Sequence, residues 1–156
     1  MTIATTVKDY LDVRGITYDA LQHYSTGSSH ESAEAAHIDE AHIAKAVILT
    51  DSRGPVMVVV PGNAWVSLSR VQKTLGCPVV LAEEAETAGL FSDCVCGAVP
   101  PLGPAYGIET LLDEALTSLA FHYVESGDHK TLLRLKGPDF IHLLAGARRG
   151  HFTSED

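Results

Sequence analysis

The amino-acid sequence predicts a mixed α/β fold, in which helices pack around a curved, mostly antiparallel mixed sheet or a partly open barrel. Helical and β-rich segments are interspersed along the chain, which indicates helices packed against one sheet. Neighbouring β-rich runs are joined by short polar turns with glycine, a pattern of hairpins and not of a doubly wound parallel sheet. With 156 residues, 46% of them hydrophobic, the chain predicts a single domain over residues 1–156.

The N-terminal part of the chain predicts two helices and a strand. Apolar residues at helical spacing predict a helix over residues 7–15, which ends at a glycine. A strand is expected over residues 16–22, and it brings His23 to its end. Ser28, followed three residues later by a glutamate, fits a capping box that begins a helix running to Ile38.

The clearest β signal is a pair of apolar runs at residues 43–50 and 56–60, joined by a polar turn. Both runs are nearly continuously apolar, so we expect a central hairpin that is covered on both faces. Lys45 is the exception in the first run. A charge inside an apolar strand must reach water, a partner or a site, which makes Lys45 a candidate functional residue.

The remaining elements follow from capping and turn signals. Ser67 or Ser69 caps a helix that Gly76 ends, and Pro138 opens the last helix. Residues 94–96 alternate as in a strand, and the cysteine thiols are expected to be buried structural groups. The other expected segments are strands over 78–81, 106–112, 119–124 and 131–135, an acidic helix over 83–88 and a flexible tail over 148–156.

The charge distribution limits the partners. A net charge of −9 argues against DNA or general nucleic-acid binding, because affinity for a phosphate backbone comes largely from Lys and Arg. Residues 130–156 nevertheless hold five of the eleven Lys and Arg and three of the twenty Asp and Glu. This segment predicts either a local basic patch or ordinary surface charge. The cations concerned are Lys130, Arg134, Lys136, Arg148 and Arg149.

Several other classes find no support in the sequence. No apolar run approaches the roughly 20 residues that span a bilayer, and the first residues do not resemble a signal peptide. The three cysteines do not have zinc or redox spacing, so we expect a reduced, cytoplasmic protein without a membrane partner. No phosphate-binding loop or metalloprotease motif is present, and the eight histidines do not show metal-ligand spacing. We therefore expect no metal and no cofactor.

A loop at residues 97–104 holds three prolines and two glycines. Such a stiff segment either connects strands or offers backbone amides and carbonyls to a ligand. His129 follows a tight turn at residues 126–128. Together with Lys45, these features predict a cleft with a cation, an imidazole and backbone donors, which suits an anionic or carbonyl-bearing ligand.

Four stretches also carry a family resemblance: residues 44–49 (AKAVIL), 58–62 (VVVPG), 97–103 (GAVPPLG) and 126–130 (SGDHK). In this order they resemble the YbaK/EbsC family, the bacterial trans-editing aminoacyl-tRNA deacylases related to the editing (insertion) domain of prolyl-tRNA synthetase. The similarity runs over about residues 20–145.

The resemblance implies a YbaK-like fold and hydrolysis of the ester that joins a wrong amino acid to tRNA. Lys45 would contact the substrate near the tRNA 3′ end, the backbone from Gly97 onward would position the water and the carbonyl, and His129 would place substrate or water. These three are the expected catalytic residues. The further residues expected to bind the substrate are His23, Ser28, Ala98, Val99, Pro100, Pro101, Leu102, Gly103, Gly127 and Asp128.

An aminoacyl ester is already activated, so positioned water and a stabilised oxyanion suffice without a catalytic triad. The acidic chain would bind aminoacyl-tRNA at its acceptor 3′ end, aided by an aminoacyl-tRNA synthetase or by the basic patch. Alanine, serine, threonine, cysteine and non-protein residues stay open as the amino acid removed. Two other functions also stay open: a non-catalytic binder of aminoacyl-tRNA ends or small anionic ligands, and a metal- or anion-binding module built on the histidines.

Overall fold

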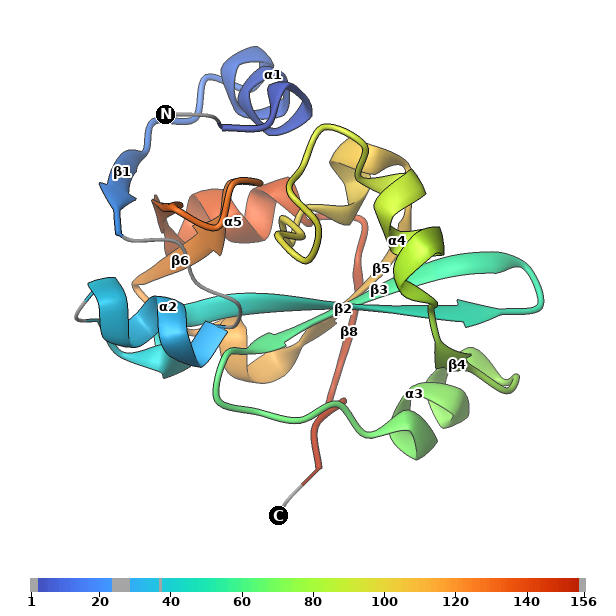
Figure 1. The fold of residues 1–156 in the computed structure, drawn as a ribbon. Coiled ribbons are helices and arrows are strands. Elements are labelled where there is room, and N and C mark those ends of the chain that lie inside the picture. Colours follow the sequence, from blue (N-terminus) through green and yellow to red (C-terminus); the bar gives the residue numbers. More distant parts are fainter. Residues whose placement is uncertain (1–2, 24–28, 37, 155–156) are drawn as a thin grey trace.

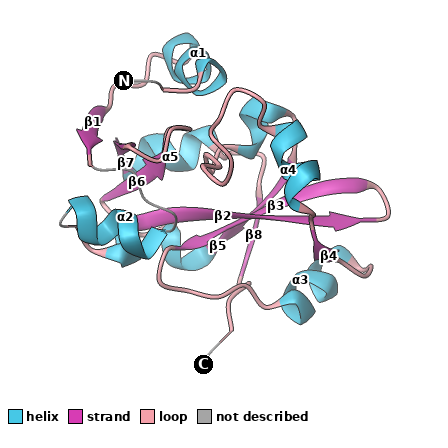
Figure 2. Ribbon diagram, viewed as in Figure 1, coloured by secondary structure: helices cyan, strands magenta, loops and turns pink. Residues whose placement is uncertain are grey.

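The computed structural model describes residues 3–23, 29–36 and 38–154 (Figure 1). Strands and helices are interspersed along these residues, as Figure 2 shows by colour. The helices are α1 (Thr5–Val13), α2 (Ser29–Ala36), α3 (Leu68–Leu75), α4 (Glu84–Leu90) and α5 (Gly137–Leu143). The strands are β1 (Asp19–Gln22), β2 (Ile43–Asp51), β3 (Gly54–Pro61), β4 (Val80–Leu81), β5 (Glu109–Asp113), β6 (Phe121–Glu125), β7 (Thr131–Lys136) and β8 (Arg148–Gly150).

The described strands form one mixed sheet in the order β1-β7-β6-β2-β3-β5-β8, with β4 paired to β2. The pairs β2–β6, β3–β5 and β5–β8 are parallel, and the other pairs are antiparallel. The sheet does not close into a barrel, and helices lie on both sides of it (Figure 1). The predicted mixed α/β class with an unclosed, mixed sheet is confirmed.

The β2–β3 hairpin is central, as the apolar runs predict. Its turn is closed by the Asp51 carboxylate, which accepts hydrogen bonds from the backbone N–H groups of Arg53 (2.7 Å) and Gly54 (3.1 Å). Alternate residues of the two strands face two separate cores. One core includes Ile48, Met57 and Val59 with residues of α1 and α5, and the other includes Leu49, Val56 and Val58 with α3 and Phe152.

Helix boundaries follow local signals. The Ser67 hydroxyl accepts a hydrogen bond from the Arg70 N–H at 3.3 Å, so Ser67 and not Ser69 caps α3. Gly76 ends this helix with a left-handed φ of 76°. Pro138 lies in the first turn of α5, as expected. The predicted cap at Ser28 lies outside the described residues.

Two of the predicted strand segments differ from the structure, one entirely and one at its beginning. Residues 94–96 form turns, and Cys96 is exposed, so the expectations of a strand and of a buried thiol are wrong there. The extended segment predicted over 106–112 is extended only from Glu109, where β5 begins, because Tyr106 still belongs to the 3₁₀ helix η2 (Gly103–Tyr106). Gly103 packs so closely on β5 that a Cβ there would overlap the Thr110 hydroxyl.

The C-terminal segment belongs to the sheet, which corrects the expected flexible tail for residues 148–154. Strand β8 pairs with β5, and Phe152 is 0% exposed. The Phe152 N–H donates to Asp113 Oδ2 at 2.9 Å, and the Ser154 N–H donates to the Trp65 carbonyl at 2.9 Å. Because of these contacts, the segment is held against the rest of the protein and is not a flexible tail. Residues 155–156 lie outside the described residues.

This topology also separates the C-terminal cations. Strand β7 lies next to one edge of the sheet and β8 forms the opposite edge. A single basic patch over residues 130–149 is therefore not formed. Arg134 lies 3.7 Å from Asp19 and packs over the Phe121 ring, whereas Arg148 donates to the Thr74 carbonyl at 2.8 Å.

Candidate active site

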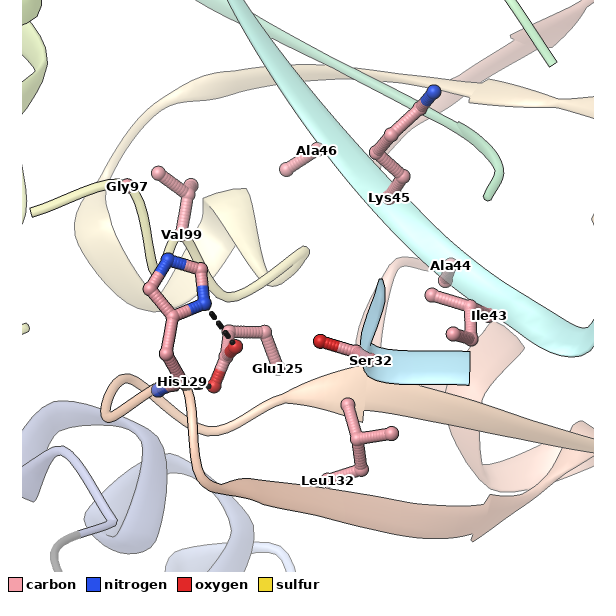
Figure 3. Close-up of a pocket in the computed structure, with 10 residues that line it drawn as sticks. All are labelled: Ser32, Ile43, Ala44, Lys45, Ala46, Gly97, Val99, Glu125, His129 and Leu132. Atoms are coloured by element: carbon pink, nitrogen blue, oxygen red, sulfur yellow. Dashed lines mark hydrogen bonds and ion pairs between the residues drawn. The ribbon is translucent and has the colours of Figure 1, made fainter. Parts of the chain in front are cut away.

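A cavity of about 230 Å³ lies between β2, the loop after Cys96 and the β6–β7 turn (Figure 3). It brings together the three groups that the sequence singles out: the β2 lysine, the glycine that begins the Pro/Gly loop and the histidine after the tight turn. Small and apolar side chains make up most of its wall. The lining residues are Ser32, Ile43, Ala44, Lys45, Ala46, Gly97, Val99, Glu125, His129 and Leu132.

The β6–β7 turn holds His129 in an unusual backbone conformation. Its φ is 58°, the left-handed region that few residues other than glycine adopt. Glu125 Oε2 accepts hydrogen bonds from the backbone N–H groups of Ser126 (2.9 Å), Gly127 (3.1 Å) and His129 (3.2 Å). Glu125 Oε1 lies 3.1 Å from His129 Nδ1 (Figure 3). One carboxylate therefore fixes both the backbone and the ring of His129.

Asp128 and Gly127 shape this turn and are not among the described residues that line the cavity. The buried Asp128 accepts hydrogen bonds at Oδ1 from the N–H groups of Lys130 and Thr131, both at 2.8 Å. Its Oδ2 accepts from the Thr131 hydroxyl at 2.9 Å. Gly127 has a φ of 115° and lies so close to Ala4 that a Cβ would stand 2.9 Å from the alanine Cβ.

The electrostatics of the turn favour the charged form of His129. The hydrogen bond to Glu125 raises the pKa of His129 above its ordinary value, against the effect of burial. The charges of Glu125 and Asp128 and a hydrogen bond to the Gly97 backbone act in the same direction. His129 thus has Nδ1 on a carboxylate and Nε2 at the cavity wall, where it can donate a proton or, once neutral, accept one.

Gly97 borders the histidine closely. It has a left-handed φ of 85°, and a Cβ there would lie 3.3 Å from His129 Nε2. Glycine is therefore favoured at this position both by backbone conformation and by space. The result is a backbone segment that lies directly beside the Nε2 atom of the imidazole.

Lys45 is one of the residues that line the cavity, but its ammonium group is bound to a carbonyl outside the described lining. Lys45 Nζ donates to the Ala64 carbonyl at 2.7 Å and lies 5.4 Å from the centroid of the Trp65 ring. Figure 3 shows this group pointing away from His129. Burial lowers the pKa of Lys45, and the charge of Glu40 acts in the opposite direction.

Strand alternation explains this arrangement. Neighbouring residues of a strand point to opposite faces, so Ala44 and Ala46 share the face opposite to Lys45. Ala46 points to the side of the Val99 loop and His129 in Figure 3. Because these alanines are small, the cavity has room beside β2. The structure thus places Lys45 and His129 at one cavity, as the sequence suggests, but the ammonium group of Lys45 points away from the imidazole.

Of the Pro/Gly loop, Gly97 and Val99 are the described residues that reach the cavity. Most of the other loop residues are buried, and Leu102 belongs to the core beside α1 and α5. His23 donates its backbone N–H to the Lys130 carbonyl at 2.8 Å and is not among the described lining residues. Ser28 lies outside the described residues. The buried supporting residues of the loop are Ala98, Pro100, Pro101, Leu102 and Gly103.

Six of the residues that line the cavity were not predicted from the sequence. Glu125 stands four residues before His129, on the other side of the tight turn, and this spacing is a signal that could have found it. The alternation of Ala44 and Ala46 around Lys45 is another. Nothing in the local sequence marks the buried Ser32. The full set is Ser32, Ile43, Ala44, Ala46, Glu125 and Leu132.

Within the part of the chain that the structure describes, no group of three or more His, Cys, Asp or Glu is placed to hold a metal ion. His122 illustrates the structural use of a histidine. Its Nε2 lies 2.6 Å from the Leu116 carbonyl, its ring packs on Phe140, and burial lowers its pKa. Among the described helices, none is both long and apolar enough to cross a membrane.

The model of the aminoacyl-tRNA editing domain family matches residues 23–143, which include all the residues that line the cavity. The chain belongs to this family. The family resemblance seen in the four sequence stretches is thereby confirmed, and the cavity lies within an aminoacyl-tRNA editing domain. No curated protein matches the chain at a significant level.

Solved structures share the editing-domain fold. The hypothetical protein APE2540 is 26% identical, with a TM-score of 0.83 over 96% of this chain and 99% of that chain. A protein proposed to be a trans-editing enzyme for prolyl-tRNA synthetase is 24% identical, with a TM-score of 0.83 over 99% of this chain and 98% of that chain. These likenesses agree with the YbaK-like fold expected from the sequence.

Proposed function

We propose that this editing domain is a trans-acting deacylase, which hydrolyses the ester between a wrong amino acid and the 3′-terminal ribose of a tRNA. The observation that carries the proposal is the cavity in which His129, fixed by Glu125, faces the Gly97 backbone. The family match supports the substrate class. The fold shared with a protein proposed as a trans-editing enzyme supports action on tRNA released by a synthetase.

In the proposed reaction, water attacks the ester carbonyl beside Gly97 and His129. The water oxygen bonds to the carbonyl carbon, the bond to the ribose oxygen breaks, and the water proton ends on that ribose oxygen. Neutral His129 Nε2 would accept this proton and pass it on, while Glu125 holds the Nδ1 side of the ring. Backbone groups of the stiff loop need no reorganisation when charge develops on the carbonyl.

The cavity wall supports a small amino acid as the group removed. Ala44, Ala46 and Gly97 leave a cavity of about 230 Å³, and Ile43, Val99 and Leu132 supply apolar walls. A pocket of this kind excludes larger side chains by steric overlap more readily than it separates similar ones. We therefore expect alanine or a residue of similar size to be removed fastest.

Lys45 would anchor the tRNA 3′ end. Its ammonium group lies 2.7 Å from the Ala64 carbonyl, which a phosphate can replace as its partner. Because the chain carries a net charge of −9, contact with the rest of the tRNA would be weak, and a synthetase would help to present the acceptor end.

The test is deacylation of a panel of mischarged tRNAs, with alanine, serine, threonine and cysteine each on a non-cognate tRNA. We expect hydrolysis of at least one member, and loss of that activity in Lys45→Ala and His129→Ala. Lys130→Ala is the matched control, since this exposed lysine is next to His129 in the chain and is not among the described lining residues. Hydrolysis of no member, or hydrolysis independent of both residues, would refute the proposal.

One observation favours a second candidate, a non-catalytic binder of aminoacyl-tRNA ends. The Lys45 ammonium is bonded to Ala64 and points away from His129, so cation and imidazole do not act on one atom in this geometry. A binder would protect the ester from spontaneous hydrolysis, whereas a deacylase accelerates it. The same assay therefore separates the two functions.

A further inference from the structure

Trp65 is an exposed aromatic residue that the proposed reaction does not use. It follows the β3 end and is 72% exposed, although tryptophan side chains are on average highly buried. It is also the single tryptophan of the chain. An apolar ring of this size on the surface is typical of a contact surface for a partner or ligand.

The backbone under this ring is held firmly. The Trp65 carbonyl accepts a hydrogen bond from the Ser154 N–H at 2.9 Å, and the next residue, Val66, bridges to Thr153. The preceding Ala64 donates its N–H to the Pro61 carbonyl at 3.0 Å. The segment therefore presents the indole ring from a fixed position while leaving the ring itself open to solvent.

Lys45 links this ring to the cavity. Lys45 is one of the residues that line the cavity, and its ammonium group lies 5.4 Å from the centroid of the Trp65 ring. Following Lys45 outward, one passes from the apolar cavity to a cation and then to an exposed aromatic face. An aminoacylated 3′ end has the same order of groups: an amino acid, a ribose with its phosphate, and a base.

We propose that Trp65 is the stacking platform for the 3′-terminal adenine of the tRNA. This assignment rests on the proposed function. Proteins bind single-stranded nucleic acid by stacking bases on aromatic side chains, combined with cations along the backbone. On a chain with a net charge of −9, stacking supplies affinity that a broad basic surface does not.

Because Trp65 is the single tryptophan, its fluorescence reports on this position alone. The probe is a short RNA that ends in CCA, titrated into the full-length protein. We expect saturable quenching, with affinity reduced about tenfold or more when the terminal adenosine is removed. Unchanged emission at all RNA concentrations would overturn the assignment, and so would equal quenching by the RNA without that adenosine. Quenching by a synthetase but not by the RNA would assign Trp65 to protein contact instead, which also overturns it.

Kinetics give a second readout. We expect Trp65→Ala to raise KM for the mischarged tRNA about tenfold or more with kcat nearly unchanged, and Trp65→Phe to retain most of the affinity. The matched control is Leu81→Ala, because Leu81 is 64% exposed on β4, away from the described cavity lining. An unchanged KM in Trp65→Ala would contradict the stacking role.

The two proposals fail separately. If the protein hydrolyses mischarged tRNA in a Lys45-dependent manner and Trp65→Ala behaves as wild type, the stacking assignment fails alone. If no tRNA is hydrolysed but the CCA-ended RNA quenches Trp65, the deacylase proposal fails and the stacking assignment holds for a binder.

Discussion

Glu125→Gln tests the arrangement around His129 most directly. The substitution keeps the size of the side chain and removes its charge. Glu125 contacts the Nδ1 atom of His129 at 3.1 Å and accepts three backbone N–H groups of the turn at 2.9 to 3.2 Å. A glutamine side chain has only one oxygen, so it cannot face the backbone N–H groups and His129 Nδ1 at the same time. If that oxygen stays with the backbone groups, the amide N–H₂ faces Nδ1 and favours the tautomer with the proton on Nε2.

The expected magnitudes follow from these contacts. Both side chains are largely buried, 14% exposed for Glu125 and 13% for His129. A hydrogen bond to a charged group contributes about 1.5 to 3 kcal/mol, so Glu125→Gln should lower the free energy of unfolding by about that amount at slightly acidic pH. With the wrong tautomer, kcat should fall on the order of 10²-fold, the lower end of what a general base contributes.

The pH dependence has a definite sign. Glu125 raises the pKa of His129 in the folded protein. The stability that this pair contributes is therefore fully present below the unfolded pKa of about 6.5, and it is lost as pH rises through the folded value. The proposed base is neutral His129, so the wild-type rate should rise with pH through a pKa above about 6.5. In Glu125→Gln that pKa should move to lower pH.

The assay measures deacylation rates from about pH 5 to about pH 9, together with urea unfolding at both ends of that range. Glu114→Gln is the matched control, because this exposed glutamate is not among the described residues that line the cavity. If Glu125→Gln retains the wild-type kcat and the wild-type rise of rate with pH, the role assigned to the pair is wrong.

Three further predictions concern the cavity wall and the C-terminal segment. Gly97→Ala should reduce kcat strongly and lower stability by about 1 kcal/mol, since it combines a φ of 85° with a Cβ 3.3 Å from His129 Nε2; Gly89→Ala in α4, with open space around its Cβ, should retain wild-type activity in the same assay. Ala46→Leu should fill the cavity and raise KM more for larger amino acids than for alanine, and equal effects on all substrates would contradict the assigned wall. Phe152→Ala should cost about 3 to 5 kcal/mol in urea unfolding, whereas a change under about 1 kcal/mol would mean that the segment after β8 is not part of the core.

Local signals accounted for much of the fold. The β2–β3 hairpin was predictable because two apolar runs flank a turn whose Asp51 and Gly54 match the observed hydrogen bonds. The ends of α3 were predictable because Ser67 and Gly76 act within their own helical turn. These features depend on neighbours a few residues away, so the sequence contains all the information that they need.

The wrong predictions, a flexible tail and a strand at residues 94–96, concern segments whose structure depends on non-local contacts. Strand β8 forms because residues 148–150 pair with the exposed edge of β5. The partners are far apart in the chain, since Leu111 pairs with Arg148, about 37 positions later. Residues 94–96 alternate as in a strand, yet the Val95 N–H donates to the Gly127 carbonyl at 2.7 Å and the segment turns there. No local pattern reports such a partner.

By itself, the sequence determined the class of fold, the family and the residue types of the site: a lysine in an apolar strand, a Pro/Gly loop and a histidine after a tight turn. Tertiary structure alone decided what these groups face. Strand alternation and the Ala64 carbonyl direct the charge of Lys45 away from His129, whereas Glu125 holds the ring of His129 beside Gly97. The physical reason is that a side chain's direction depends on partners brought close by folding, and chain order does not specify them.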